Sequence, residues 1–247
     1  MSDIFDYELL HHGPWQEFER NVARLLIYLG WKDPRLVGRT GDGGADVIAV
    51  STTGDISLFQ CKFTSKSPPG KNAIDEVRKA GKLYDADSLF VVTSQTPTKG
   101  FFDELGRVRS MGLPISYIGP EDLIKASKES KIYPPSKLKL REYQADAVEA
   151  LRSSLLDTGR GQLVLATGLG KTVVMAELVS DMLSDGLLGS GRVLVLAHTL
   201  PLVNQLLLSF WRHLPKNIST HRYAEGERPN SFDGITFSIL KQGNPIE

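Results

Sequence analysis

A glycine-rich loop in the second half of the chain constrains the fold most strongly. The apolar run from Gln162 to Ala166 reads as a buried strand, and Thr167-Gly168-Leu169-Gly170-Lys171-Thr172 follows it. Residues 171–183 then show the apolar spacing of a helix. When a strand, a glycine-rich turn and a helix follow in this order, the backbone N–H groups of the turn and the N-terminus of the helix face the same position, where an anion can bind. The pattern predicts an α/β unit that binds a phosphate group.

The side chains of this loop are those that a nucleotide requires. Lys171 is placed to reach the β- and γ-phosphates of ATP, and the Thr172 hydroxyl is placed to bind Mg²⁺. Thr167, Gly168 and Gly170 supply the backbone that surrounds the phosphates. The loop departs from the general pattern because Leu165 stands where the first glycine is usual. A strand-to-helix turn without a ligand is the alternative.

Bulk composition limits what the 247-residue chain does. Its net charge is zero, so any contact with DNA must come from a local basic patch. The densest basic stretch comprises Lys62, Lys66, Lys71, Arg78, Lys79 and Lys82. For the last three of these, a solvated helix face is the alternative. A single cysteine, no secretory signal and no long apolar run predict a cytoplasmic protein without a membrane partner.

The first half alternates helix and strand patterns. Helices are expected at 14–29, 72–84 and 98–111, and strands at 35–37, 45–50, 57–63, 88–93 and 114–118. This order predicts an α/β sandwich with a mixed sheet. The polar stretch 125–137 reads as a linker stiffened by Pro134-Pro135. We therefore expect one domain over 1–127, a linker over 128–137 and a second domain over 138–247. In the second domain we expect helices at 141–156 and 201–211 and strands at 192–197 and 235–240.

Three polar side chains of the first half suit phosphodiester hydrolysis. Gln60 and Lys62 lie two residues apart on an expected strand, so both side chains point to the same face. Asp46 follows a glycine-rich turn and enters the preceding strand, from which it is expected to share a Mg²⁺ ion with Gln60 while Lys62 orients a water molecule. Glu19, on the first long helix, is a further carboxylate near this group. Phe59 and Cys61 are expected to point the other way.

Several segments together resemble the Mrr-like restriction endonucleases, a branch of the PD-(D/E)xK nuclease superfamily. They are Glu17-Phe18-Glu19 on a helix that ends in Leu29-Gly30-Trp31, then Gly38 to Asp46, then Gln60-Cys61-Lys62, and later Phe90 to Ser94. The resemblance spans residues 14–126. It implies a restriction-endonuclease-like sandwich and Mg²⁺-dependent cleavage of DNA, with Asp46, Gln60 and Lys62 as catalytic residues and Glu19 as an accessory. Gln60 stands where the superfamily usually has an acid.

The second half resembles superfamily 2 helicases. Leu140-Arg141-Glu142-Tyr143-Gln144 is similar to the helicase segment that reads adenine, which implies that Gln144 hydrogen-bonds the base. The Ala-Thr-Gly-x-Gly-Lys-Thr loop also fits that family. An Asp-Glu strand and a second RecA-like lobe are expected after Leu240, so the resemblance implies an incomplete RecA-like domain. We expect weak ATP binding without efficient hydrolysis, helicase or translocase activity.

These patterns predict a restriction or anti-phage endonuclease joined to the start of an ATP-dependent motor. DNA and ATP are the expected partners, Mg²⁺ and ATP the expected cofactors, and a homodimer the expected arrangement for double-strand cleavage. One alternative stays open. In it, the nuclease fold is a catalytically inert DNA-binding or regulatory module, since Gln60 replaces an acid.

Overall fold

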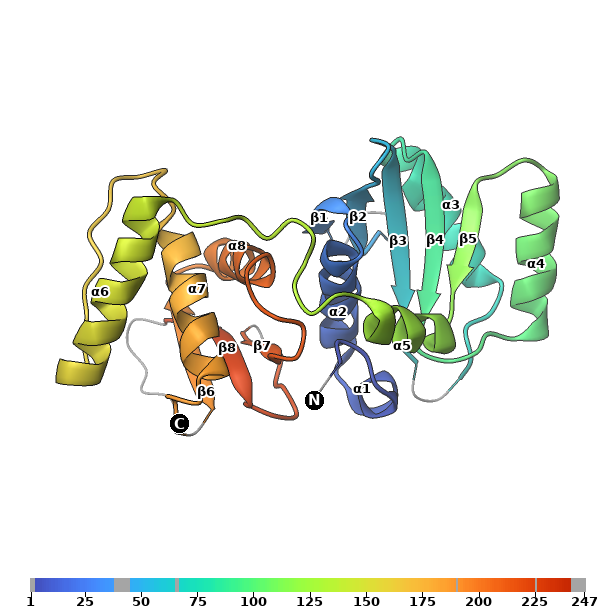
Figure 1. The fold of residues 1–247 in the computed structure, drawn as a ribbon. Helices are drawn as coiled ribbons and strands as arrows, with labels where there is room; N and C mark the ends of the chain where they lie inside the picture. Colours follow the sequence, from blue (N-terminus) through green and yellow to red (C-terminus); the bar gives the residue numbers. More distant parts are fainter. Residues whose placement is uncertain (1–2, 38–44, 65–66, 190, 225, 241–247) are drawn as a thin grey trace. The chain divides into compact units, whose positions relative to one another are not determined.

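The computed structural model describes residues 3–37, 45–64, 67–189, 191–224 and 226–240. The chain divides into two compact units, Met1–Lys131 and Ile132–Glu247 (Figure 1). Both units are mixed α/β structures, which confirms the predicted fold class. The glycine-rich turn at 38–44 and Lys66 of the basic stretch lie outside the described residues.

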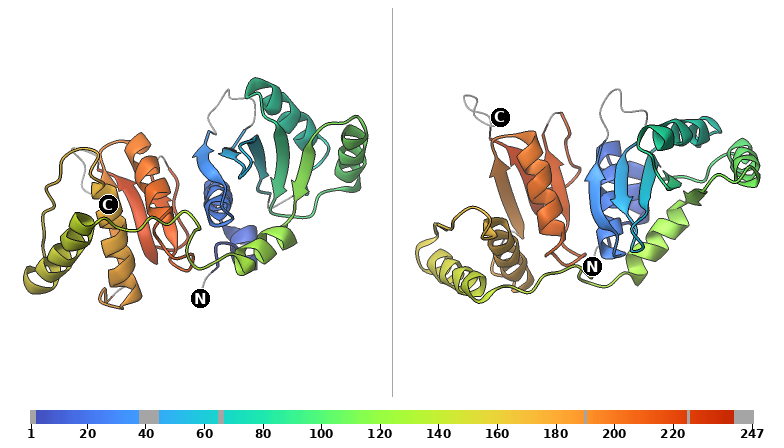
Figure 2. Two further views of the ribbon diagram at one scale, coloured as in Figure 1. Left: turned by 45° about the horizontal axis from the view of Figure 1, so that its top comes forward. Right: turned by 90° about the horizontal axis from the view of Figure 1, so that it is seen from above.

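The first unit is built on a five-stranded mixed sheet (Figures 1 and 2). In spatial order its strands are β1 (Lys32–Leu36), β2 (Val47–Val50), β3 (Ile56–Lys62), β4 (Ser88–Thr93) and β5 (Ile115–Ile118). The β1–β2 and β2–β3 pairs are antiparallel, whereas β3–β4 and β4–β5 are parallel. Since β3 and β4 each connect through a helix to a parallel neighbour, the carboxyl ends of both strands meet at one edge of the sheet.

Alternation along β3 assigns its side chains to two faces. Leu58 belongs to a buried cluster with residues of α3 (Asn72–Leu83) and α4 (Lys99–Ser110). Phe59 instead stacks on Phe90 with ring centroids 4.6 Å apart and meets the Trp31 ring edge-on. Trp31 lies three residues after the end of α2 (Trp15–Tyr28), which packs against β1, β2 and β3. The sheet therefore has a core on each face, as an α/β sandwich requires.

Two helices of the first unit were not predicted. They are α1 (Tyr7–His12) and α5 (Pro120–Glu129), which covers residues that the composition assigns to a linker. Leu123, Ile124 and Ser127 of α5 are buried, and the Ser127 Oγ accepts a 3.1 Å hydrogen bond from the Phe5 N–H. The polar composition concealed this helix because its buried face consists of only these few residues.

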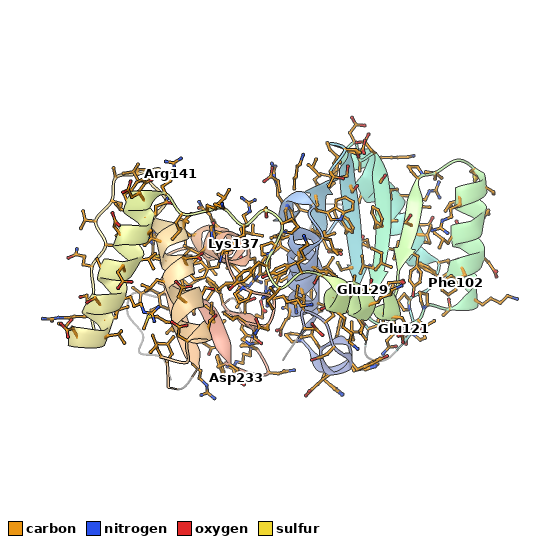
Figure 3. The ribbon with its side chains drawn as sticks, viewed as in Figure 1. Phe102, Glu121, Glu129, Lys137, Arg141 and Asp233 are labelled. Carbon is orange, nitrogen blue, oxygen red and sulfur yellow. The ribbon has the colours of Figure 1, made fainter. Side chains whose placement is uncertain are left out.

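The second unit has a three-stranded parallel sheet in the order β6 (Arg192–Ala197), β8 (Gly234–Ile239), β7 (Thr220–Tyr223). Its helices are α6 (Glu142–Thr158), α7 (Lys171–Ser184) and α8 (Leu200–Trp211), of which α8 packs on β6 and β8. Lys137, labelled in Figure 3, joins the entry segment to α7 through a 2.9 Å ion pair with Glu177. None of the described helices is long and apolar enough to cross a bilayer.

The strand predicted at Gln162–Ala166 does not form, and this expectation was wrong. Leu163 and Leu165 pack against a cluster of α6 and α7 side chains, while Val164 is 81% exposed. An apolar run becomes a strand only if another strand pairs with it, and β6, β7 and β8 pair only with one another in the described part of the chain. Leu194 and Leu196 of β6 are correspondingly exposed, and an open apolar cavity of about 430 Å³ lies beside them.

Candidate functional site

Asp46 directly precedes β2 and is fixed there by backbone hydrogen bonds on both sides. Its N–H donates to the Phe59 carbonyl at 3.2 Å, and its carbonyl accepts from the Val37 N–H at 3.0 Å. The carboxylate therefore points along the edge of β3, where its Oδ2 accepts from the Cys61 N–H at 2.6 Å. Asp46 thus satisfies a backbone donor that lies beyond the end of the β2–β3 ladder.

The Gln60 side chain meets the same carboxylate oxygen. Its Nε2 donates to Asp46 Oδ2 at 3.0 Å. A carboxylate only accepts hydrogen bonds, so this contact fixes the orientation of the amide and turns Oε1 away from Asp46. The residue is 4% exposed, and Oε1 has no hydrogen-bond partner among the described residues. A buried amide oxygen in this state carries a desolvation cost that a bound cation would remove.

Lys62 lies at the end of β3 and forms an ion pair with Glu76 of α3. Both side chains are partly exposed, at 26% and 45%. Glu76 was not predicted as a site residue, because it lies within a basic stretch and far from Lys62 along the chain. The β3–α3 packing brings the two together, and Glu76 thereby restrains the ammonium group.

Glu19 reaches the site from the other face of the sheet. It lines a cavity of about 190 Å³ together with Lys62 and Cys61. The remaining lining residues are Trp15, Phe18 and Phe63. Burial, and secondarily the charges of Asp46 and Glu19, raises the pKa of the Cys61 thiol well above its usual range. Cys61 therefore remains a protonated core thiol at neutral pH.

The donor set suits a hard divalent cation more than a transition metal. The described residues contain no cluster of three or more His, Cys, Asp or Glu side chains. Asp46 and Gln60 instead offer one carboxylate and one amide oxygen. Mg²⁺ is commonly held by one or two carboxylates, with water and substrate phosphates completing its shell. The orphaned Gln60 Oε1 is the feature of this structure that fits such an ion.

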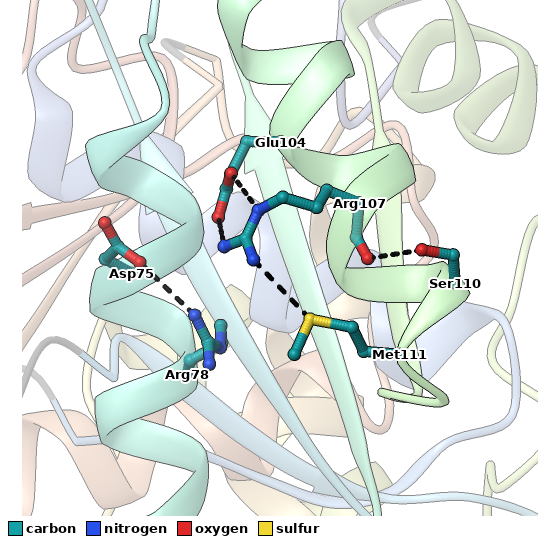
Figure 4. Close-up of polar contacts among 6 residues, drawn as sticks. All are labelled: Asp75, Arg78, Glu104, Arg107, Ser110 and Met111. Carbon is teal, nitrogen blue, oxygen red and sulfur yellow. Dashed lines mark hydrogen bonds and ion pairs between the residues drawn. The ribbon is translucent and has the colours of Figure 1, made fainter.

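The exposed face of α3 carries the basic residues that follow Lys62. Figure 4 shows that two arginines near this face already have carboxylate partners. Arg78 Nη1 lies 3.4 Å from Asp75, and Arg107 of α4 contacts Glu104 through Nε at 2.8 Å. Hydrogen bonding to Arg107 lowers the pKa of the Glu104 carboxyl. Among the described residues of this stretch, the exposed basic side chains without a carboxylate partner named above are Lys71, Lys79 and Lys82.

The glycine-rich loop of the second unit leads directly into α7, although no strand precedes it. Gly168 and Gly170 have φ values of +85° and +83°, which favour glycine, and Gly170 caps α7. Lys171 Nζ donates to the Leu165 carbonyl at 2.7 Å and the Ala166 carbonyl at 3.2 Å. The ammonium group is thus folded back over the loop. Thr167 is exposed and Thr172 is half-buried at the first turn of α7.

Gln144 is bonded within the protein at both ends of its amide. Its Nε2 donates to the Leu169 carbonyl at 3.0 Å, and its Oε1 accepts from the Arg141 N–H at 3.0 Å. The side chain therefore ties the start of α6 to the glycine-rich loop. Contact with adenine remains a prediction for this residue.

Comparison with known families assigns each unit. Residues 10–111 match the model of a restriction endonuclease family of the Mrr catalytic type, and residues 137–242 match that of the type III restriction enzyme, res subunit. The chain joins an Mrr-type restriction endonuclease domain to part of a superfamily 2 helicase-like domain. Asp46, Gln60, Lys62, Glu19 and the α3 lysines all lie within the Mrr-type match. The glycine-rich loop lies within the res-subunit match.

Two solved structures are similar to this restriction-type chain. One is the ATP-dependent type ISP restriction-modification enzyme LlaBIII bound to DNA, with 20% identity and a TM-score of 0.40 over 90% of this chain. The chain spans 16% of that protein's length. The other is AF1548, a protein of unknown function, with 18% identity and a TM-score of 0.37 over 66% of this chain and 95% of its own. No curated protein sequence matches the chain.

Proposed function

We propose that the first unit is a Mg²⁺-dependent endodeoxyribonuclease of the restriction or anti-phage type. The observation that carries the proposal is the Gln60 amide, whose nitrogen is bonded to Asp46 while its oxygen is buried without a partner. If the amide turns so that Oε1 rather than Nε2 faces Asp46, this pair would hold the ion. Lys62 lies two residues further along the same strand. A bound Mg²⁺ would supply Lewis-acid activation of the phosphate and of a water molecule.

The side chains have distinct parts in the proposed reaction. Asp46 directly precedes β2 and Gln60 lies in the adjacent β3, so the sheet holds the two side chains in a fixed relation. The Gln60 oxygen would bind the ion once the amide has turned. Lys62 places a positive charge where the cleaved phosphate gains negative charge, and Glu76 restrains its position. Glu19 adds a carboxylate on the α2 side. Cleavage of both strands would need two such sites, for which a homodimer is the simplest arrangement.

The lysines of α3 are proposed to contact the DNA backbone. Lys71, Lys79 and Lys82 are exposed on the helix that also carries Glu76, and Lys79 and Lys82 line a groove of about 300 Å³. Phosphate contacts of this kind position DNA without reading its sequence.

Incubation of supercoiled plasmid with the full chain tests the nuclease proposal. We expect nicked and linear products with Mg²⁺ and none in EDTA. Uncut plasmid at every Mg²⁺ concentration, together with plasmid binding, would favour the alternative of an inert DNA-binding module.

For the second unit we propose ATP binding at Thr167, Gly168, Gly170, Lys171 and Thr172, with Gln144 near the base and Thr172 near Mg²⁺. The positive-φ glycines and the Lys171 ammonium support this. Titration with a fluorescent ATP analogue should show binding that Lys171→Ala removes, because this change deletes the loop's cation. Equal binding by the variant would contradict the assignment.

A further inference from the structure

Trp15 is unusually exposed for a tryptophan. Its side chain is 55% exposed, whereas Trp211 is fully buried and Trp31 is half-buried against Phe59 and Phe90. Large apolar side chains left in solvent are informative because burying them would stabilise the fold. Trp15 therefore contributes little to the core of the first unit.

The position of Trp15 connects it to the candidate active site. It is the first residue of α2, and Glu19 follows one turn later on the same side of the helix. Both residues line the 190 Å³ cavity that also contains Lys62 and Phe63. Phe63 packs on Phe18 with ring centroids 5.8 Å apart, and this contact holds the aromatic wall of the cavity in place.

The cavity combines two kinds of recognition chemistry. Lys62 would bind a phosphate in exchange for its ion pair with Glu76, and the Trp15 indole offers a flat apolar surface in the lining of the same cavity. The volume is below the roughly 300 Å³ at which pockets for drug-sized ligands begin, so it suits a single ring. A nucleotide has both complementary parts, since its base stacks on aromatic side chains and its phosphate binds cations.

We propose that Trp15 stacks on an unpaired base next to the phosphate that is cleaved. In a paired duplex the faces of each base are covered by neighbouring bases, so an indole reaches one only where a nucleotide is single-stranded or extruded. The inference rests on the proposed nuclease function and narrows its substrate class to DNA with an unpaired nucleotide at the cut.

Tryptophan fluorescence tests the stacking directly. The full chain is titrated in EDTA, which prevents cleavage, with a short single-stranded DNA that has no self-complementary segment and with the blunt duplex of that strand and its complement. The signal of Trp15 is the difference between the wild-type protein and Trp15→Phe. We expect this difference signal to be quenched by the single strand and not by the duplex.

Affinity measurements complete the test. Trp15→Ala should weaken binding of the single strand roughly ten-fold, a factor that corresponds to ~1.4 kcal/mol and lies within the range for base stacking. Tyr7→Ala is the matched control, because Tyr7 is 57% exposed, belongs to α1 and does not line the cavity. Circular dichroism confirms that each variant is folded.

The outcomes separate this inference from the nuclease proposal. If plasmid is cleaved with Mg²⁺ but Trp15→Ala binds the single strand as tightly as wild type, the stacking role is wrong and the nuclease proposal stands. Equal quenching by duplex and single strand would also overturn the stated substrate class. If the chain neither binds nor cleaves DNA, both proposals fail.

Discussion

Gln60 is the residue whose chemistry most affects the proposed metal site. Its amide forms one hydrogen bond to Asp46 and leaves one buried oxygen, an arrangement that satisfies the carboxylate even when no cation is bound. An acid at this position would face Asp46 as a like charge instead. The amide therefore stabilises the metal-free site and also lowers its affinity for Mg²⁺.

Gln60→Glu should destabilise the metal-free protein and strengthen Mg²⁺ binding. Without metal the variant should lose roughly 1–3 kcal/mol of stability, because a hydrogen bond is replaced by two close carboxylates. With saturating Mg²⁺ it should gain more stability than wild type, since a second carboxylate binds the ion more tightly. Thermal unfolding with and without Mg²⁺ measures both effects. A variant that is destabilised equally under the two conditions would show that no ion binds beside residue 60.

Among the secondary-structure elements, α3 links the proposed cleavage site to the proposed DNA contact. Glu76 pairs with Lys62, and Lys79 follows about one turn later along the helix. A 12-residue helix is roughly 18 Å long, so its lysines can contact phosphates several base pairs from the cut. We therefore propose that this element orients the duplex on the sheet.

Replacing Lys79 and Lys82 by alanine should weaken DNA binding without unfolding the protein. Each lost phosphate contact should reduce the slope of log affinity against log salt by about 1, so the double variant should lose about 2. Fluorescence anisotropy over a salt series gives this slope. Lys125→Ala/Lys131→Ala is the control, because it removes equal charge from exposed positions elsewhere in the unit. A control with the same loss of slope would refute a specific role for α3.

The three-stranded sheet of the second unit has one well-packed face. Phe237 is fully buried and meets Phe210 of α8 edge-on at 5.2 Å, whereas Leu194 is 55% exposed. Phe237→Ala should cost roughly 3–5 kcal/mol through cavity formation, and Leu194→Ala should cost less than ~1 kcal/mol. Urea unfolding of the full chain would reveal the difference. A large loss for Leu194→Ala would mean that another part of the protein covers this face.

Sequence patterns predicted the helices and strands whose own apolar periodicity is clear. The strands β3, β4 and β6 and the helices α2, α3 and α7 lie within a few residues of the predicted bounds. The failed strand at Gln162–Ala166 depended on a pairing partner that local sequence cannot reveal. Short elements such as α1 and β7 have too few residues for a periodic signal.

The candidate site shows the same limit. Gln60 and Lys62 were found because strand alternation places residues two apart on one face. Glu76 was missed because its contact with Lys62 arises from the packing of α3 on β3, which no local pattern encodes. Trp15 was not selected because exposure of a helical residue depends on what the rest of the chain leaves uncovered.

For the whole molecule, the two units should unfold separately. Each has its own sheet and helices, and the contacts divide near residues 131 and 132. We expect residues 1–131 expressed alone to show a cooperative thermal transition, since a sheet with a core on each face lies entirely within them. A product that aggregates or lacks a transition would show that the nuclease unit depends on the second half.

Cleavage of supercoiled plasmid by site variants of the full chain tests the central claim most directly. Asp46→Asn and Lys62→Ala should each abolish Mg²⁺-dependent nicking while keeping the wild-type circular dichroism spectrum, and Lys125→Ala should cut at the wild-type rate. The first two changes remove the proposed metal ligand and cation, whereas the third removes a distant charge. Wild-type cleavage by folded Asp46→Asn and Lys62→Ala proteins would contradict the account and place the active site elsewhere.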